Sequence, residues 1–441
     1  MRILALIFVV SLTAFASSVR AENYKFLELY ELAREKDPSL GFFRSQLDGA
    51  RAQRDVSRGQ MFPQLSVFGD WSENKVRYEN TELGQIPTQE YPGERYGLQL
   101  KAPLFSMRAW REYERRSALV GQSQEELVFA ETELLGSLVK AYLEVLLADE
   151  TSLALDAELV ALQAEVTQAE ALFDRSLIPV TAVLEAKTRL DALSADVIEA
   201  SGQAQIAREA LVQIVGIRNI EPSAVASKIL LSTPISSPDS AAELALKFDS
   251  NVASKEEAVL AARKGIAREK GSWLPEVDFL YTSQYSDVGF DNLVSPPRSS
   301  ESYSISFRYP IFEGGSGSAR LRGAWAEFYA AQHKLEEARR SAVGRARAAW
   351  LGLDAATERV SATQVALKTA EINLEAASKA VKLGSARVSD VLLALAQRTR
   401  AKRTLNKARF ERAMAWLELE LAIGSDPGAL APQFSTALHG P

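Results

Sequence analysis

The chain contains two copies of one long unit, and this duplication constrains its fold more than any other feature. Four landmarks recur in the same order about 210 positions later. The unit is far longer than the roughly 20 to 50 residues of a solenoid repeat, so we expect two similar halves rather than a stack of small repeats. The corresponding residues are Pro63 and Pro275, Pro103 and Pro310, Tyr142 and Trp350, and Val183 and Val391.

The expected division of the chain follows from these pairs and from local composition. The segment between the halves contains Pro222, Pro234 and Pro238, which is typical of a linker. The predicted parts are a signal peptide at 1–21, a first repeat at 22–216, the linker at 217–240, a second repeat at 241–424 and a polar C-terminal tail at 425–441.

The N-terminus predicts export from the cytoplasm. Arg2 precedes a short apolar run and then small residues that end at Ala21, which is the layout of a secretory signal peptide. Cleavage after Ala16 is the alternative. The chain has no cysteine, so we expect neither disulfides nor a lipidated N-terminal cysteine, and hence not a lipoprotein.

Each half has the same plan of helical patterns, two strands and a long helical hairpin. The first helix of each hairpin runs for about 70 residues without proline, so it would be roughly 100 Å long. Apolar residues spaced three and four apart, from Leu159 to Phe173 and from Leu367 to Val381, predict coiled-coil-like packing. The strands are expected at 63–75, 95–104, 275–287 and 302–311, and the hairpins at 106–215 and 316–424.

The strands alternate polar and apolar residues, which is typical of a sheet with two unlike faces. After the signal peptide no window holds the ~20 apolar residues of a membrane helix, so a membrane span would need closed β-strands. The strands are rich in aromatic residues, which favours a membrane barrel over the half-buried sheet of a soluble protein. We expect Phe279, Tyr281, Ile305 and Phe307 to face lipid, and Asp70, Lys101, Asp278 and Arg308 to face the barrel lumen.

A glycine-rich turn between strand and helix, with Gly314, Gly315 and Gly317, has the layout of a phosphate-binding loop. The preceding strand nevertheless alternates in polarity, unlike a buried parallel strand. The corresponding turn of the first half has Ser106, Met107 and no glycine. We therefore expect the glycines to form an elbow between a strand and a long helix, and a nucleotide-dependent enzyme is a distant alternative.

The order of these elements, their duplication, and the segments "YPIFEGG" and "LGSARVSDVLLA" resemble the TolC-like outer-membrane efflux family over about residues 24–424. The resemblance implies a mainly α fold with a membrane β-barrel. Three copies of the chain would form one 12-stranded barrel and a periplasmic α-helical barrel. It also implies a passive export channel, in outer-membrane lipid, whose periplasmic tips dock to an adaptor and an inner-membrane transporter for efflux or type I secretion.

The resemblance also assigns residues at the tips. Adaptor contact is implied for Ser176, Leu177, Pro179, Gly384 and Ser385, and a tip constriction for Arg387 and Asp390. Two positions depart from the family pattern, since Leu393 and Ala182 stand where acidic residues are frequent. An alternative role for Asp390 is a helix-start carboxylate, and Ser385 has the similar alternative of an N-cap.

Several classes of function are disfavoured by composition. The net charge of −6 and the lack of a basic stripe argue against nucleic-acid binding. Only His333 and His439 are histidines, and no metal-spaced cluster, catalytic triad or Walker lysine is present, so we expect no enzyme activity and no cofactor. The alternative function from another class is a periplasmic coiled-coil adaptor or scaffold without a pore.

Overall fold

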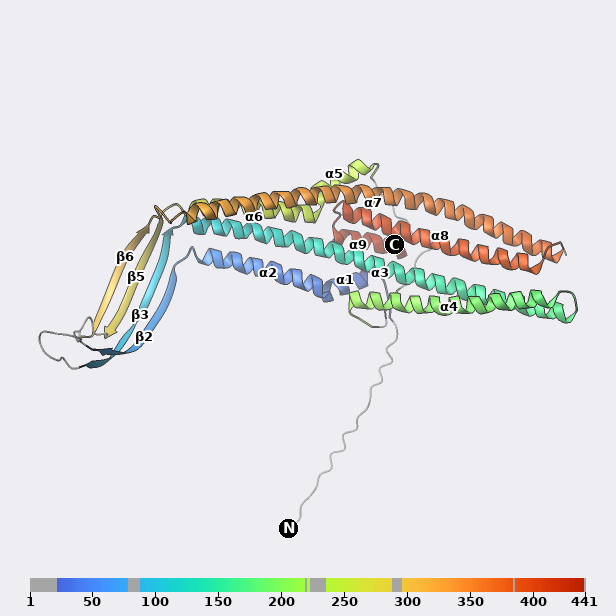
Figure 1. Cartoon of the computed structure of the whole chain (residues 1–441), viewed down its shortest axis with the longest axis horizontal. Coiled ribbons are helices and arrows are strands. Elements are labelled where there is room, and N and C mark those ends of the chain that lie inside the picture. Colours follow the sequence, from blue (N-terminus) through green and yellow to red (C-terminus); the bar gives the residue numbers. More distant parts are fainter. Residues whose placement is uncertain are drawn as a thin grey trace, which may run out of the picture.

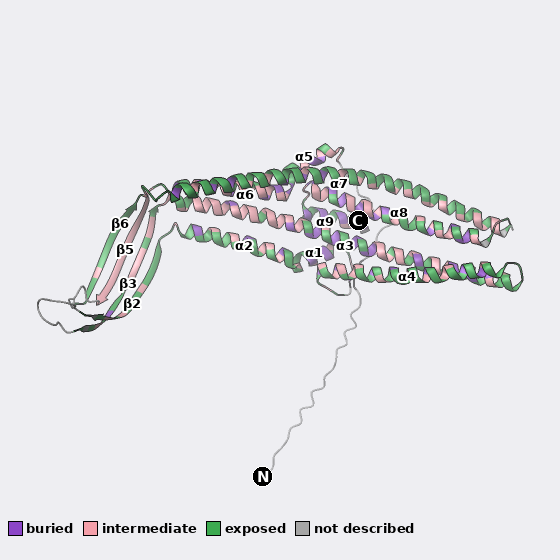
Figure 2. Ribbon diagram, viewed as in Figure 1, coloured by how far each residue is buried: buried purple, intermediate pink, exposed green. Residues whose placement is uncertain are grey.

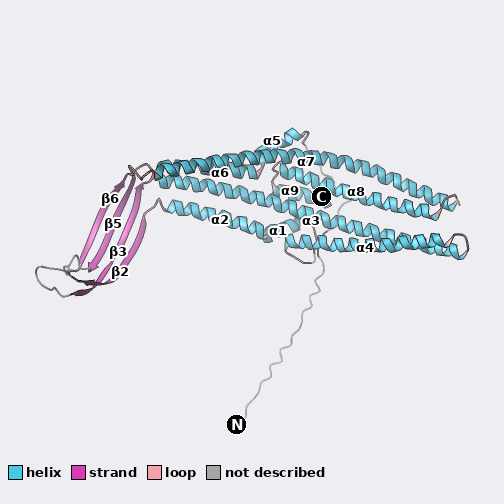
Figure 3. Cartoon of the chain, viewed as in Figure 1, coloured by secondary structure: helices cyan, strands magenta, loops and turns pink. Residues whose placement is uncertain are grey.

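A computed structural model describes residues 22–77, 88–218, 220–222, 235–287, 296–383 and 385–439. The predicted signal peptide, residues 1–21, lies outside this part of the chain. The described part is strongly elongated, with a small sheet at one end and long helices that run away from it (Figure 1). The four-stranded sheet lies at one end of the molecule, and the long helices extend from it to the other end (Figure 3).

The elements pair across the two halves in order and in length. In residues, α1 and α5 each have 11, α2 and α6 each have 22, α3 and α7 have 68 and 67, and α4 and α8 have 36 and 35. The first half comprises α1 (Phe26–Lys36), α2 (Pro38–Gly59), β2 (Gln64–Val76), β3 (Gln89–Phe105), α3 (Met107–Asp174) and α4 (Val180–Val215). The second comprises α5 (Pro238–Phe248), α6 (Ser250–Gly271), β5 (Glu276–Asp287), β6 (Arg298–Arg308), α7 (Ser316–Lys382) and α8 (Val388–Ala422).

Equivalent residues begin the equivalent helices. The Asp37 side chain accepts a hydrogen bond from Leu40 N at the start of α2, and Asp249 accepts one from Val252 N at the start of α6. Such N-caps satisfy backbone N–H groups that lack a partner within the helix. Before α7, Gly314 and Gly315 have φ angles of 61° and 84°, which glycine adopts without steric cost. The chain turns there from a strand into a long helix.

Four strands form one antiparallel sheet in the order β2-β3-β5-β6, so the β3–β5 pairing joins the two halves. Strand β3 starts at Gln89, earlier than the expected residue 95. The prediction began too late because Pro92 and Gly93 are unusual inside a strand. Pro92 pairs with β2 alone, and Pro103 follows the last β2 partner of β3. A missing N–H is tolerated where a strand has a neighbour on one side only.

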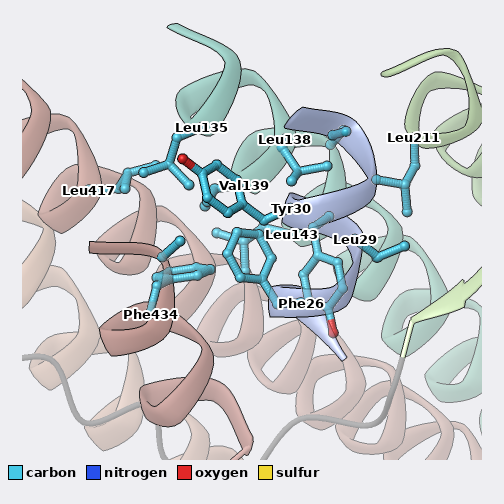
Figure 4. Close-up of a cluster of buried hydrophobic side chains, with 14 of the residues drawn as sticks. Phe26, Leu29, Tyr30, Leu135, Leu138, Val139, Leu143, Leu211, Leu417 and Phe434 are labelled. Atoms are coloured by element: carbon cyan, nitrogen blue, oxygen red, sulfur yellow. The ribbon is translucent and has the colours of Figure 1, made fainter. Parts of the chain in front are cut away.

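The main hydrophobic core lies midway along the molecule, where purple residues concentrate in Figure 2. Helix α1 packs there against α3, and Phe26 forms edge-to-face contacts with Tyr142 and Phe434 at 5.4 and 5.0 Å. Leu135, Leu138 and Leu417 belong to the same cluster (Figure 4).

The C-terminal segment corrects the sequence prediction of a polar tail at 425–441. Residues Pro427–His439 form helix α9, whose Leu430, Ala431, Phe434 and Leu438 are buried in the main core. Their spacing places them on one helix face. The proline-, glycine- and serine-rich composition obscured this periodicity.

The predicted linker, 217–240, is described in part. Ile220–Pro222 form strand β4, which pairs in parallel with β1 (Glu22–Tyr24), and α5 already begins at Pro238. Among the described residues, no helix combines the length and the hydropathy that a membrane span requires.

Candidate functional site: the sheet faces and the helical tips

The sheet register separates the two sets of residues that the alternation predicted. Lys101 pairs with Gln64 and Leu280, and Asp278 pairs with Ser306, so Asp70, Lys101, Asp278 and Arg308 share one face. This polar face also carries Thr282 and a row of serines on β6. Side chains directly opposite each other on antiparallel strands project to the same side.

Ion pairs link the strands across the polar face. Lys101 Nζ lies 3.3 Å from Asp278 Oδ2, between β3 and β5. Arg95 Nη2 lies 2.7 Å from Asp70 Oδ2, between β2 and β3. Arg95 was not identified from the sequence, although its even spacing from Lys101 would have placed it on this face. Both pairs are accessible to solvent, so each adds little to stability.

The opposite face is apolar and open to solvent in the single chain. Phe279 pairs with Ile305, Tyr281 with Tyr303, and Val277 with Phe307. Ile305 and Phe307 are 69% and 67% exposed, whereas Phe279 and Tyr281 are half-buried among their neighbours. A contiguous exposed apolar face of this kind marks an interaction surface rather than ordinary protein surface.

Both outer edges of the sheet lack a partner strand among the described residues, because β2 pairs with β3 only and β6 with β5 only. These strands have 13 and 11 residues. A long unpaired edge exposes a row of backbone N–H and C=O groups.

The first tip, between α3 and α4, is a tight turn. Ser176 has a φ of 60°, in the left-handed region. Its N–H donates to Phe173 O at 2.7 Å, and Leu177 N–H donates to Leu172 O at 2.9 Å, which is the bond pattern of a Schellman motif. Pro179 is the N-cap of α4, and the Leu177 side chain is 66% exposed.

The second tip, between α7 and α8, is described apart from Gly384, which lies outside the described residues. Ser385 donates both its N–H and its Oγ to Ala380 O, at 2.9 and 3.1 Å, so it closes α7 rather than capping α8. The N-cap of α8 is Arg387, whose N–H donates to Asp390 Oδ2 at 2.9 Å. Asp390 thus occupies the helix-start position that was the alternative to a constriction role.

Leu393, beside the tip, is 50% exposed, whereas Leu392 is buried against α3 and α4. Arg387 and Asp390 form no side-chain ion pair with each other in the described part of the tip.

A network of ion pairs ties three helices together just below the sheet. Glu112 on α3 accepts hydrogen bonds from Arg115, Arg116 and Arg268 at 2.9, 2.7 and 3.2 Å. On α6, the buried Glu269 contacts Arg268 and lies 3.5 Å from Arg320 of α7.

Burial alone would raise the pKa of the Glu112 carboxyl. The hydrogen bonds and charges of the three arginines outweigh burial and lower the pKa to about 2. Sequence reasoning missed this network, although Glu112 and Arg320 occupy corresponding positions in the two halves.

No group of three or more potential metal ligands occurs in the part of the chain that the structure describes. His333 lies exposed on α7, and the His439 side chain is outside the described atoms. The candidate surfaces are the two sheet faces, the sheet edges and the tips.

Comparisons with known proteins agree with this geometry. The family model described as outer membrane efflux protein matches residues 29–217 and 241–425. The outer membrane protein TolC of Escherichia coli (strain K12) is 24% identical, over 96% of this chain and 86% of TolC. The proteases secretion protein PrtF of Dickeya chrysanthemi is 24% identical, over 95% and 92% of the two chains.

The crystal structure of the outer membrane protein VceC from Vibrio cholerae superposes with a TM-score of 0.77 at 20% identity. The match covers 90% of this chain and 96% of that chain, and it shows that the fold is shared.

Proposed function

The chain belongs to the outer membrane efflux protein family, and from this membership we propose that it works as a passive, trimeric export duct. Family membership makes it an outer-membrane transport channel of a Gram-negative bacterium, not an enzyme. The proposal adds that three copies close a 12-stranded barrel in the membrane and a helical barrel in the periplasm. Residues 1–21 would be the export signal.

The observation that carries the proposal is the four-stranded sheet with two unlike faces and two open edges. Pairing β6 of one copy with β2 of the next would satisfy the edge groups, and three such pairings close a ring of twelve strands. The face with Ile305 and Phe307 would contact lipid, as would Phe279 and Tyr281. The face with Asp70, Lys101, Asp278 and Arg308 would line the lumen.

The long helices support the same assembly, because both edges of the helical layer carry exposed apolar stripes. On α7, Leu351, Val365 and Ile372 are 56%, 65% and 59% exposed. Ile372 lies two residues from Ala370 and Leu374, which are half-buried, so its exposed side chain projects from the opposite side of α7.

The other edge, α4, has the same construction. Leu184 and Ile198 are 57% and 72% exposed and lie two residues from the buried Ala186 and Ala200. We propose that the α7 stripe of one copy packs against the α4 stripe of the next.

At the far end, the two tips would meet a periplasmic adaptor and an inner-membrane transporter. Ser176, Leu177, Pro179 and Ser385 lie in the two tip turns, and Gly384 is assigned with them from the sequence. One relative is by name a protein for the secretion of proteases, so the proposal covers both efflux and protein export. Arg387 and Asp390 would narrow the duct here.

The assembly is tested by the mass and the conductance of the purified full chain in detergent. We expect particles of three chains that form ion-conducting pores in planar bilayers. A variant with Ile305→Asp and Phe307→Asp should lose membrane insertion, and one with Ser304→Asp and Ser306→Asp on the polar face should retain it. A water-soluble monomer that carbonate washes from membranes would instead support the adaptor alternative.

The lumen assignment is tested with single cysteines, since the chain has none of its own. Cysteine in place of Lys101 or Asp278 should react with a small charged thiol reagent, whereas cysteine in place of Phe279 or Ile305 should be protected by lipid. Equal reactivity on both faces would contradict the assignment.

A further inference from the structure

The apolar face of the sheet ends in charged residues at its hairpin end, most of them acidic, although Lys75 also lies there in an ion pair with Glu90. Glu73, Glu94, Asp287 and Glu301 share this face with Phe279 and Ile305, and Glu94 pairs directly with Asp287. From Asp287 to Val277 the strand covers roughly 33 Å, which a barrel tilt reduces to the ~25 Å of a hydrocarbon band. The other membrane boundary therefore falls where the strands meet the helices.

Exposed aromatic residues gather at this second boundary. Phe62, Trp110, Trp273 and Phe312 are 53%, 53%, 46% and 85% exposed, and each lies between a strand and the sheet-side end of a helix or in its first turn. Trp325, 37% exposed on α7, stacks on Tyr329 at 5.8 Å. Tryptophan and tyrosine are enriched where hydrocarbon meets headgroups.

Four exposed cations lie at the same level, within about two turns (~10 Å) of the sheet-side helix ends. Arg58 is in the last turn of α2, Arg108 in the first turn of α3, Lys270 in the last turn of α6, and Arg322 near the start of α7. Figure 1 shows these four helix ends next to the sheet.

Two of these cations lie over exposed rings. Arg58 Cζ is 6.0 Å from the Phe62 centroid, and Lys270 Nζ is 5.9 Å from that of Trp325. Arginine and lysine side chains can lay their stems on apolar surface while the charge stays in the polar layer.

Most carboxylates at this level are already engaged by other cations, so these cations are in excess, although Glu276 accepts a hydrogen bond only from Ser106 at 3.3 Å. Glu112 is held by three arginines, Glu269 by Arg268 and Arg320, and Glu313 by Arg320. None of the four exposed cations forms an ion pair with a carboxylate in the described part of the chain. This local excess of positive charge contrasts with the net charge of −6 of the whole chain.

We propose that Arg58, Arg108, Lys270 and Arg322 form a basic girdle that binds the headgroups of anionic phospholipids in the periplasmic leaflet. The inference rests on the proposed membrane assembly and adds the lipid class. Charge complementarity favours this occupant, because an anionic headgroup supplies the negative charge that the surrounding protein does not.

A second copy of the chain fits less well. Arg58 and Arg322 lie on the two edge elements, α2 and α7, which the proposed trimer brings together. Two like charges would then face each other, and a negatively charged lipid between them would relieve the repulsion.

The experiment uses tryptophan quenching by brominated lipids in vesicles of phosphatidylglycerol mixed with phosphatidylcholine. The full-length chain carries Trp71→Phe, so that contact is reported by Trp110, Trp273 and Trp325, while Trp350 and Trp416 lie far along the helices. Bromine is placed on one lipid at a time, which gives the relative binding constant of the two headgroups.

We expect a preference for phosphatidylglycerol of about threefold at low salt, falling toward one at high salt. A quadruple variant should show no preference, and a matched variant without four exposed cations of the distant helices should keep it. The test variant is Arg58→Gln, Arg108→Gln, Lys270→Gln and Arg322→Gln. The matched variant is Lys140→Gln, Lys334→Gln, Lys368→Gln and Arg400→Gln.

The outcomes distinguish a failure of the girdle from a failure of the membrane assembly. Quenching by both lipids without preference, at all salt concentrations, would overturn the girdle and leave the membrane channel intact. No quenching by either lipid would overturn the membrane assembly itself, and the girdle with it. A preference that survives in the quadruple variant would assign the lipid contact to other residues. If that variant does not insert into vesicles, the parent chain alone tests the girdle. A lipid preference that falls toward one at high salt supports the girdle, and a preference that does not change with salt contradicts it.

Discussion

Tyr142 and Trp350 occupy the same position in the two halves, but their surroundings differ. Tyr142 on α3 is fully buried and touches Phe26. Trp350 on α7 is half-buried, and its Nε1–H donates to Ile235 O at 3.3 Å. Helix α3 lies inside the layer, in contact with α2, α4, α6 and α8, whereas α7 lies at its edge.

The difference shows that the two copies of the unit bury their long helices differently, one within the chain and the other only in part. In the first half, α1 and α9 cover the long helix and complete a core within the chain. In the second half, α5 covers α7 over a short stretch, and the cluster beneath it is built largely from alanines such as Ala338, Ala342 and Ala346. The apolar residues farther along α7 remain exposed, and in our proposal they pack against another copy.

The sharpest test of this comparison replaces the two equivalent aromatic residues. Tyr142→Ala should lower the free energy of unfolding by about 3–5 kcal/mol, because it opens a cavity in a closed core. Trp350→Ala should cost only about 1–2 kcal/mol, because that side chain is partly solvated. Denaturant unfolding followed by circular dichroism measures both, and equal costs would contradict the division into central and edge helices.

The second test addresses the exposed stripe of α7. Ile372→Asp should weaken each contact between copies by about 2 kcal/mol, because it would bury an unpaired carboxylate there. The helical content of the single chain should not change. Particle mass in detergent, measured over a dilution series, reports the effect. Gln364→Asp, at an exposed polar position off the stripe, is the matched control, and dissociation of both variants alike would count against the proposed contact.

The order and length of the helices were predictable from the duplication and from the spacing of apolar residues, because each of these patterns extends over many residues. The sheet faces were predictable for the same reason, since Lys101 and Asp278 meet on one face as alternation requires.

The sequence prediction failed where single prolines or glycines obscured the periodic spacing of apolar residues. Pro92 hid the start of β3, and the prolines and glycine of 427–432 hid α9. The Glu112 network was beyond reach, because it depends on which helices become neighbours. Asp390 shows another limit, since one motif position fits either a constriction or a helix start.

The third test uses the Glu112 network, in which the halves carry opposite charges at corresponding positions. Glu112→Gln should cost about 1–2 kcal/mol at neutral pH, because Arg268 loses a charged partner. The folded pKa of Glu112 is lowered to about 2 from 4.5, so its stabilisation is complete above pH 4.5 and is lost as the pH falls toward 2. Unfolding midpoints of the parent and of Glu112→Gln should therefore converge in acid. Glu327→Gln, at an exposed carboxylate without an ion pair, should change neither quantity.

The smallest effect is expected at the tips, where Ser176 holds a left-handed conformation that the second half assigns to a glycine in sequence. Ser176→Gly should raise stability by about 0.5–1 kcal/mol, because glycine adopts a φ of 60° without the steric cost of a Cβ. The same substitution inside α4, Ser201→Gly, should lower stability by a similar amount, because glycine is unfavourable in a helix interior. Paired unfolding curves measure the two signs. If Ser176→Gly also destabilises, the serine makes contacts at the tip that outweigh its backbone strain, and the two tips are not equivalent turns.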